Sequence, residues 1–207
     1  MKTMIKRTVI LGIASICAFA TLADERASQA LQSKLAGMQQ FSADFTQEVT
    51  DPQGEQIHQA SGKLVMARPD KLRWETAQPD DTLLVADGHA VWNVDTFVEQ
   101  VTIVDQAEAI NDNPIILLTT NNPRKWQQFS IAQPSADTFT ITPVNGQGQI
   151  QQLELVFDND VLSALSMQDA QEQTSALSFT NVKTDFTPAL TLFEVTIGDH
   201  YTIDDQR

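Results

Sequence analysis

The spacing of hydrophobic residues changes once along this chain, close to Phe41. Over residues 24–40 apolar side chains recur at steps of three and four, which predicts a helix with one apolar stripe. From Phe41 onward apolar and polar residues alternate, which predicts strands with one buried face. Turn-forming pairs, such as Asp-Gly at 87–88 and Asn-Gly at 145–146, separate these runs and favour antiparallel neighbours. Many short strands at regular spacing predict a sandwich or a barrel.

One apolar segment, residues 106–120, interrupts the strands. It predicts two short helices, at 107–112 and 114–119, because Pro114 suits the first turn of a helix. Their apolar content is high for a connection between strands, so we expect them to cover a face of the sheet. The simplest arrangement is mainly β with short helices. In it, an antiparallel sheet curls into a barrel and all three helices lie against its concave face.

Residues 1–23 have the pattern of a secretory signal peptide. Three basic residues precede an apolar run over residues 9–22, and a cleavage-site segment ends it at 21–23. The run is too short to span a membrane as a helix, which disfavours the alternative of a retained N-terminal anchor. We predict cleavage after Ala23, which leaves a single domain at residues 24–207.

The single cysteine, Cys17, lies inside this apolar run, and Ile16 precedes it. Lipid attachment requires a small residue just before the cysteine, so we interpret Cys17 as part of the signal peptide. The mature chain then has no disulfide and no lipid anchor. Removing residues 1–23 takes away three positive charges and changes the net charge from −14 to −17. This balance argues against nucleic acid and anionic membrane surfaces as partners, and its simplest role is solubility.

The sequence carries no recognisable catalytic or metal-binding pattern. Its three histidines, His58, His89 and His200, lie in unrelated contexts and lack metal-ligand spacing to Cys, Asp or Glu. Nucleophile-elbow and phosphate-binding glycine motifs are absent. The paired aspartates at 80–81 and 204–205 are typical of solvated loops. We therefore predict a protein that is not an enzyme and that needs no metal and no cofactor.

The order of short motifs along the chain resembles the outer-membrane-lipoprotein carrier family, LolA. The resemblance covers about 180 residues behind the predicted signal peptide. Its specificity comes from the collinear set of motifs and not from any one of them. In chain order the matching segments are FSADFTQ at 41–47, RP at 68–69 followed by Trp74, QPD at 78–80, LVADG at 84–88, Trp92, FVEQ at 97–100, WQQ at 126–128 and TIDDQR at 202–207.

The resemblance implies an incomplete antiparallel β-barrel with a helical lid over an apolar cavity. It also implies a soluble, monomeric periplasmic chaperone. Such a carrier receives acylated lipoproteins from an inner-membrane LolCDE-type release complex and passes them to an outer-membrane LolB-type acceptor. In the family an arginine before proline holds the lid closed, and Arg68 has that place here. Leu72 departs from the family, which has an aromatic residue shortly before the tryptophan at 74.

Strand alternation and the apolar helices predict which residues line the cavity. Flexible methionine and aromatic side chains suit an adaptable pocket, although an ordinary filled core uses the same residues. A one-residue slip in register would swap every side chain to the other face. The runner-up function is a periplasmic barrel that binds a small free lipid or another apolar ligand. The predicted lining residues are Leu35, Met38, Phe45, Leu64, Met66, Leu72, Trp74, Leu84, Trp92, Ile110 and Leu118.

Overall fold

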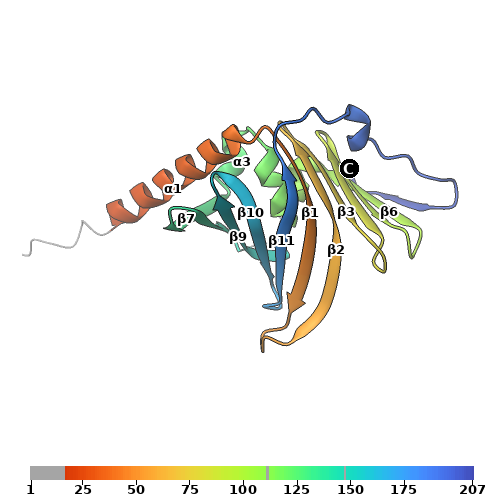
Figure 1. The fold of residues 1–207 in the computed structure, drawn as a ribbon, viewed down its shortest axis with the longest axis horizontal. Coiled ribbons are helices and arrows are strands. Elements are labelled where there is room, and N and C mark those ends of the chain that lie inside the picture. The colour runs from red at the N-terminus through yellow and green to blue at the C-terminus, as the bar shows by residue number, and fades with distance from the viewer. Residues whose placement is uncertain (1–16, 111, 147) are drawn as a thin grey trace, which may run out of the picture.

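In the computed structural model, which describes residues 17–110, 112–146 and 148–207, one twelve-stranded sheet curls without closing (Figure 1). The strand order is β12-β6-β5-β4-β3-β2-β1-β11-β10-β9-β8-β7. Neighbouring strands are antiparallel, except that β12 runs parallel to β6. The strands are β1 (Gln40–Thr50), β2 (Gln56–Ala67), β3 (Lys71–Thr76), β4 (Thr82–Asp87), β5 (Ala90–Asp95), β6 (Gln100–Asp105), β7 (Phe129–Ser135), β8 (Thr138–Pro143), β9 (Ile150–Asp158), β10 (Val161–Asp169), β11 (Thr174–Lys183) and β12 (Thr202–Asp205).

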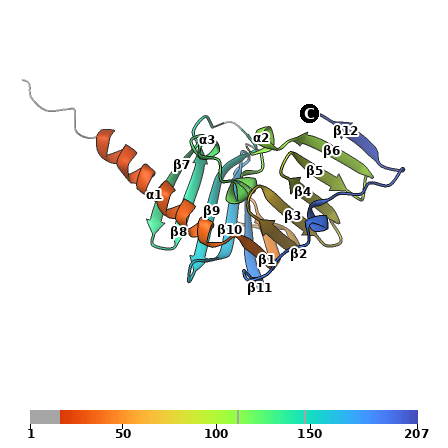
Figure 2. The same ribbon diagram turned by 90° about the horizontal axis from the view of Figure 1, so that it is seen from above.

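Helices cover the concave side of this sheet. The long helix α1 lies across the half that contains β7 to β10, and the short green helices lie within the curl (Figure 2). The C-terminal segment runs along the outside (Figure 1). The helical segments are α1 (Cys17–Gly37), α2 (Gln106–Ala109), the 3-10 helix η1 (Pro114–Thr119), α3 (Pro123–Trp126) and the 3-10 helix η2 (Leu190–Phe193).

The predicted fold class, mainly β with short helices and an incomplete barrel, is confirmed. The second predicted short helix has the observed bounds of η1, and the first is shorter than predicted, since α2 ends at Ala109. Helix α1 ends at Gly37 and not near Gln40, because Gln40 already begins β1. The helices α3 and η2 were not predicted.

Helix α1 begins at Cys17, so it includes residues on both sides of the predicted cleavage point after Ala23. Residues 1–16 of the predicted signal peptide lie outside the described residues. Cleavage at this point therefore stays a prediction.

Strands β1, β2 and β3 pack closely at the centre of the sheet. Phe41, Ala43 and Phe45 are 0–2% exposed on the concave face, and their neighbours face outward. Gly62 of β2 lies opposite Phe45. A Cβ atom at position 62 would lie 2.0 Å from the carbonyl oxygen of Glu75 and 2.6 Å from the Phe45 ring. Only glycine permits this close approach of β1, β2 and β3.

Each face of the sheet carries an apolar layer. On the concave face a single large cluster joins α1, η1 and strands from both halves of the sheet. On the convex face two smaller clusters lie beneath the C-terminal segment. There Phe193, only 2% exposed, packs with Val65 and Val85. The molecule therefore has two covered faces, and only one of them is covered by the predicted lid.

Candidate functional site

Side chains of η1 fill the centre of the concave face. Ile116 and Leu117 are fully buried, and Ile115 and Leu118 are nearly so. The helix contacts β3 on one side and β9 on the other. Since these strands belong to different halves of the sheet, η1 lies inside the curl and connects its two halves. An apolar segment of six residues thus covers the concave face as its composition predicts.

Ten of the eleven predicted lining residues lie on this concave face. Eight of them are buried within the concave cluster: Leu35, Met38, Phe45, Leu64, Met66, Leu72, Ile110 and Leu118. Trp74 and Leu84 are half-buried and pack against its edge. The Trp74 ring makes an edge-to-face contact with Phe45, with ring centroids 5.3 Å apart. The structure thus brings residues from α1, four strands and both ends of the lid into one apolar surface.

Trp92 is a correction to the predicted lining. Its ring packs against the convex clusters and not the concave one, and its indole Nε1 donates a hydrogen bond to Asp87 over 2.9 Å. Ala90, Trp92 and Val94 do share one face of β5, as their alternation predicts. That face is the convex one, because Val91 is the residue that β5 directs into the concave cluster.

The concave face is packed along most of its length, and one pocket lies at the end where η1 begins. This end pocket has a volume of about 270 Å³. It lies between β3, β4, β10 and the start of η1, with Trp74, Leu84, Ile115 and Met167 as its apolar lining. Pockets for drug-sized ligands measure roughly 300–1,000 Å³, so larger apolar ligands require η1 to move. In the closed form, this pocket is the apolar space beside the start of the lid.

Arg68 joins the end of η1 to the rim of the sheet. Its guanidinium Nη1 donates to the carbonyl oxygen of Leu118, and Nη2 donates to the carbonyl oxygen of Thr120 over 2.9 Å. Nη2 also donates to the side-chain oxygen of Asn121 over 2.5 Å. Nearby, the backbone N–H of Asp70 donates to the carbonyl oxygen of Thr119 over 3.0 Å. One side chain thus satisfies carbonyl groups that the end of a helix leaves free.

Burial and incomplete pairing limit the strength of the Arg68 contacts. Burial lowers the pKa of the Arg68 guanidinium, and the nearby Asp70 carboxylate opposes this shift. The group nevertheless keeps its charge at neutral pH, since arginine is effectively always protonated. Within the described part of the chain, Nε of Arg68 and one carboxylate oxygen of Asp70 are buried without a hydrogen-bond partner. Each such group costs roughly 1–3 kcal/mol, and this cost offsets part of the stabilisation that the Arg68 hydrogen bonds give to the closed form.

Gln106 is a further contact residue that the sequence did not indicate. Its side chain is 2% exposed and stands at the first position of α2. Its Nε2 donates to the carbonyl oxygen of Asp70, and its Oε1 accepts from the backbone N–H of Gly88, both over 2.8 Å. The start of the lid segment is therefore tied to the loop that carries Arg68. A lone glutamine before an apolar run gives no signal of this role.

The described residues contain no cluster of His, Cys, Asp and Glu that would hold a metal ion. His58 pairs with Asp80 over 2.8 Å at the surface, and His89 and His200 lie in separate turns. None of the described helices is both long enough and apolar enough to cross a bilayer.

Together these features define a class of protein: a half-open antiparallel barrel with an apolar interior, closed by a short helical lid and an arginine contact. Residues 36–196 match the family described as "Outer membrane lipoprotein carrier protein LolA". The chain therefore belongs to the LolA family of carrier proteins, as its motifs predict.

Relatives of full length support this membership. An outer-membrane lipoprotein carrier protein from Pseudoalteromonas translucida is 35% identical over 202 residues, which cover 96% of this chain and 96% of that protein. The protein of the same name from Actinobacillus succinogenes is 35% identical over 209 residues, covering 100% and 98% of the two chains.

Solved structures share the fold at low identity. An uncharacterised conserved protein from Thermus thermophilus has a TM-score of 0.51 and 11% identity, over 88% of this chain and 98% of that one. A DUF1329 family protein from Desulfovibrio piger has a TM-score of 0.50 and 8% identity, over 83% and 97%. At these identities the likeness concerns the fold alone.

Proposed function

We propose that this protein is a periplasmic chaperone that carries acylated lipoproteins from the inner to the outer membrane. It would receive them from a LolCDE-type release complex and deliver them to a LolB-type acceptor. The observation that carries the proposal is the lid: four consecutive apolar residues of η1 fill the concave face that acyl chains would otherwise occupy. The names of the full-length relatives support the same cargo.

The energetics fit a reversible carrier. Burying an acyl chain contributes about 0.8 kcal/mol per CH₂, so a chain of about 16 carbons gains roughly 12 kcal/mol. The same burial would make release slow unless something replaces the chain. Ile115 to Leu118 do so, because they return to the concave face when the chain leaves. The protein therefore exchanges one apolar filling for another and never exposes the empty interior to water.

Arg68 is the proposed latch of this exchange. Hydrogen bonds that involve a charged group contribute roughly 1.5–3 kcal/mol. Opening the lid forfeits the contacts to Leu118 and Thr120, which weakens cargo binding by about 10- to 100-fold. A carrier needs this opposing contribution, since cargo held with the full burial energy would not pass to the acceptor.

Export and processing belong to the same proposal. A signal peptide removed after Ala23 would deliver one domain of residues 24–207 to the periplasm. N-terminal sequencing of the protein purified from periplasm tests this point. A chain that begins at Asp24, or within a few residues of it, is the expected result, and a chain that keeps residues 1–16 contradicts it.

The decisive experiment is a release assay. Membranes that hold the release complex and a triacylated lipoprotein are incubated with ATP and this protein, then sedimented. A soluble one-to-one complex of protein and lipoprotein supports the carrier function. A matched lipoprotein without its acylated cysteine is the control and should not be captured. If only free lipid is extracted, the protein is instead a binder of small apolar ligands, and the carrier function is wrong.

A further inference from the structure

A second hollow lies at the other end of the concave face. This pocket, about 430 Å³ in volume, is formed where the C-terminal half of α1 crosses the turn between β9 and β10. Ala30, Gly37, Met38 and Val161 form its apolar lining, and Ser33, Lys34, Asp160 and Thr184 complete it with polar side chains. It is separate from the end pocket at Trp74, with which it shares no lining residue.

The floor of this α1 pocket is part of the concave cluster. Met38 is a buried member of that cluster, and Ala30 and Val161 pack against it. Val161 and Met167, which line the two opposite pockets, lie six residues apart on β10. At about 3.3 Å per residue this separation is roughly 20 Å. One leaflet of a bilayer's hydrocarbon core is about 15 Å thick, so an acyl chain is long enough to span most of this path.

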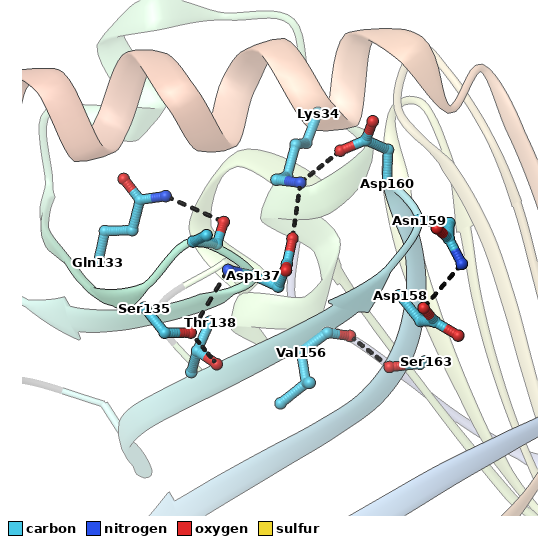
Figure 3. A network of polar contacts seen from close by, with 11 residues as sticks. Lys34, Gln133, Ser135, Asp137, Thr138, Val156, Asp158, Asn159, Asp160 and Ser163 are labelled. Carbon is cyan, nitrogen blue, oxygen red and sulfur yellow. Dashed lines mark hydrogen bonds and ion pairs between the residues drawn. The ribbon is translucent and has the colours of Figure 1, made fainter.

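Lys34 clamps α1 over the pocket. Its ammonium group bonds to Asp137 in the turn after β7, over 3.2 Å, and to Asp160 in the turn after β9 (Figure 3). The same nitrogen lies 5.4 Å from the centre of the Phe157 ring. The lysine side chain is 16% exposed, whereas those of Asp137 and Asp160 are 57% and 80% exposed. Ion pairs with such exposed partners are weak and screened by salt, so this clamp can part without a large penalty.

We propose that the α1 pocket is a subsite for the distal ends of long acyl chains, and that it joins the space under η1 when the Lys34 ion pairs part. The inference rests on the proposed carrier function and extends it. Short chains fit beneath η1 alone, and long chains need the α1 pocket as well. The occupant is thus the cargo's own hydrocarbon, because the pocket's apolar floor is continuous with the concave cluster.

A substitution at Gly37 offers a way to block the α1 pocket while leaving the space under η1 unchanged. An added Cβ atom at position 37 meets no heavy atom within 4 Å, and Gly37 does not have a positive φ. Because Gly37 lines the pocket, we expect Gly37→Leu to direct its side chain into this space, and Gly37→Ala is the matched control.

The test measures calorimetric affinities for a diacylated lipopeptide with two C16 chains and for its C8 analogue. Gly37→Leu should weaken C16 binding by about 15-fold, the loss expected when two methylene groups at about 0.8 kcal/mol each stay in water. C8 binding should not change, and Gly37→Ala should bind both as the wild type does. Equal effects on both lipopeptides, or none, would overturn the subsite. Failure of the wild-type protein to bind either lipopeptide would overturn the carrier function itself.

Lys34→Met tests the clamp in the same assay. The substitution keeps an apolar stem of similar length and removes both ion pairs. C16 binding should tighten in low salt by up to about fivefold for each of the two pairs, or about 25-fold at most, because an exposed pair contributes no more than about 1 kcal/mol, and the gain should vanish in about 1 M salt. Tightening that persists in high salt, or no tightening in low salt, contradicts a gating role for Lys34.

Discussion

The two covered faces of the sheet are closed in different ways. On the concave face, η1 packs through its side chains, and its end is attached by Arg68 and by one backbone bond from Asp70 to Thr119. On the convex face, the cover ends in β12, which pairs with β6 in a four-residue ladder. Backbone bonds at Thr202 and Gln206, each 2.8 Å long, extend that ladder at both ends.

This contrast separates a movable cover from a permanent one. To lift η1, the protein breaks a few bonds at one end and exchanges one apolar surface for another. To lift the convex cover, the protein must break a strand pairing and remove Phe193 from its cluster with Val65 and Val85. Arg207 adds contacts there, since its guanidinium bonds to Asp205 and lies 5.8 Å from the Trp92 ring. We therefore expect substitutions on the convex face to affect stability with or without cargo, and those at η1 to affect stability mainly in the empty protein.

The largest effect is expected at Phe193. Phe193→Ala removes a side chain that is 2% exposed and should lower the free energy of unfolding by about 3–5 kcal/mol. Leu190→Ala, at a residue 69% exposed in the same segment, should change it by no more than about 0.5 kcal/mol. Thermal and urea unfolding measure both. Equal losses would mean that the convex cover is not packed as described.

A smaller and conditional effect is expected at Leu117. Leu117→Ala removes a fully buried lid side chain and should destabilise the empty protein by about 2–5 kcal/mol. If acyl chains replace the lid in the loaded protein, as proposed, the same substitution should cost much less there. Melting temperatures of empty and loaded protein reveal the difference. A loss that is the same in both states would show that η1 stays in place when cargo binds.

Arg68→Leu should slow the transfer of cargo to the acceptor. The closed form loses roughly 1.5–3 kcal/mol, so the variant should still accept lipoprotein, hold it more tightly and release it about 10- to 100-fold less readily to purified acceptor. Arg68→Lys keeps the charge but loses the planar guanidinium group, so its transfer rate should lie between those of the wild type and Arg68→Leu. Transfer from the loaded carrier is the readout. If a normally folded Arg68→Leu variant transfers at the wild-type rate, Arg68 is not a latch.

The smallest effect is expected on the rate at which partner proteins associate with this protein. The net charge of the predicted mature chain, −17, should attract basic surfaces on the release complex or the acceptor. Transfer should slow several-fold as salt rises from about 0.01 M to 0.15 M, where the Debye length falls from about 30 Å to 8 Å. Rates that do not depend on ionic strength would leave solubility as the reason for the acidity.

The concave face was largely predictable from the sequence, because alternation reports which residues share a face. Phe45, Leu64 and Leu72 are examples, and the 3-10 helix at 114–119 followed from one proline and an apolar run. Trp92 shows the limit of this reasoning. Alternation groups it correctly with Ala90 and Val94, but it cannot say which side of a sheet is covered by which segment.

The convex cover and the Lys34 ion pairs had no signal in the sequence, and Arg68 was identified only through the family resemblance, for physical reasons. The segment around Phe193 is irregular, and so has no period that reveals its buried face. Arg68 bonds to backbone carbonyl groups, which every residue possesses, so its partners leave no trace in residue type. Lys34 pairs with aspartates that lie more than a hundred positions away in the chain.

The central claim, that acyl chains lie on the concave face, can be tested with two neighbouring positions. Leu84 and Trp92 lie on the adjacent strands β4 and β5 but on opposite faces. A photoreactive amino acid is placed at either position, and the carrier is loaded with lipoprotein that has labelled acyl chains. The account predicts a cross-link to the acyl label from position 84 and none from position 92. A cross-link from position 92 alone, or equal cross-links from both, would contradict it.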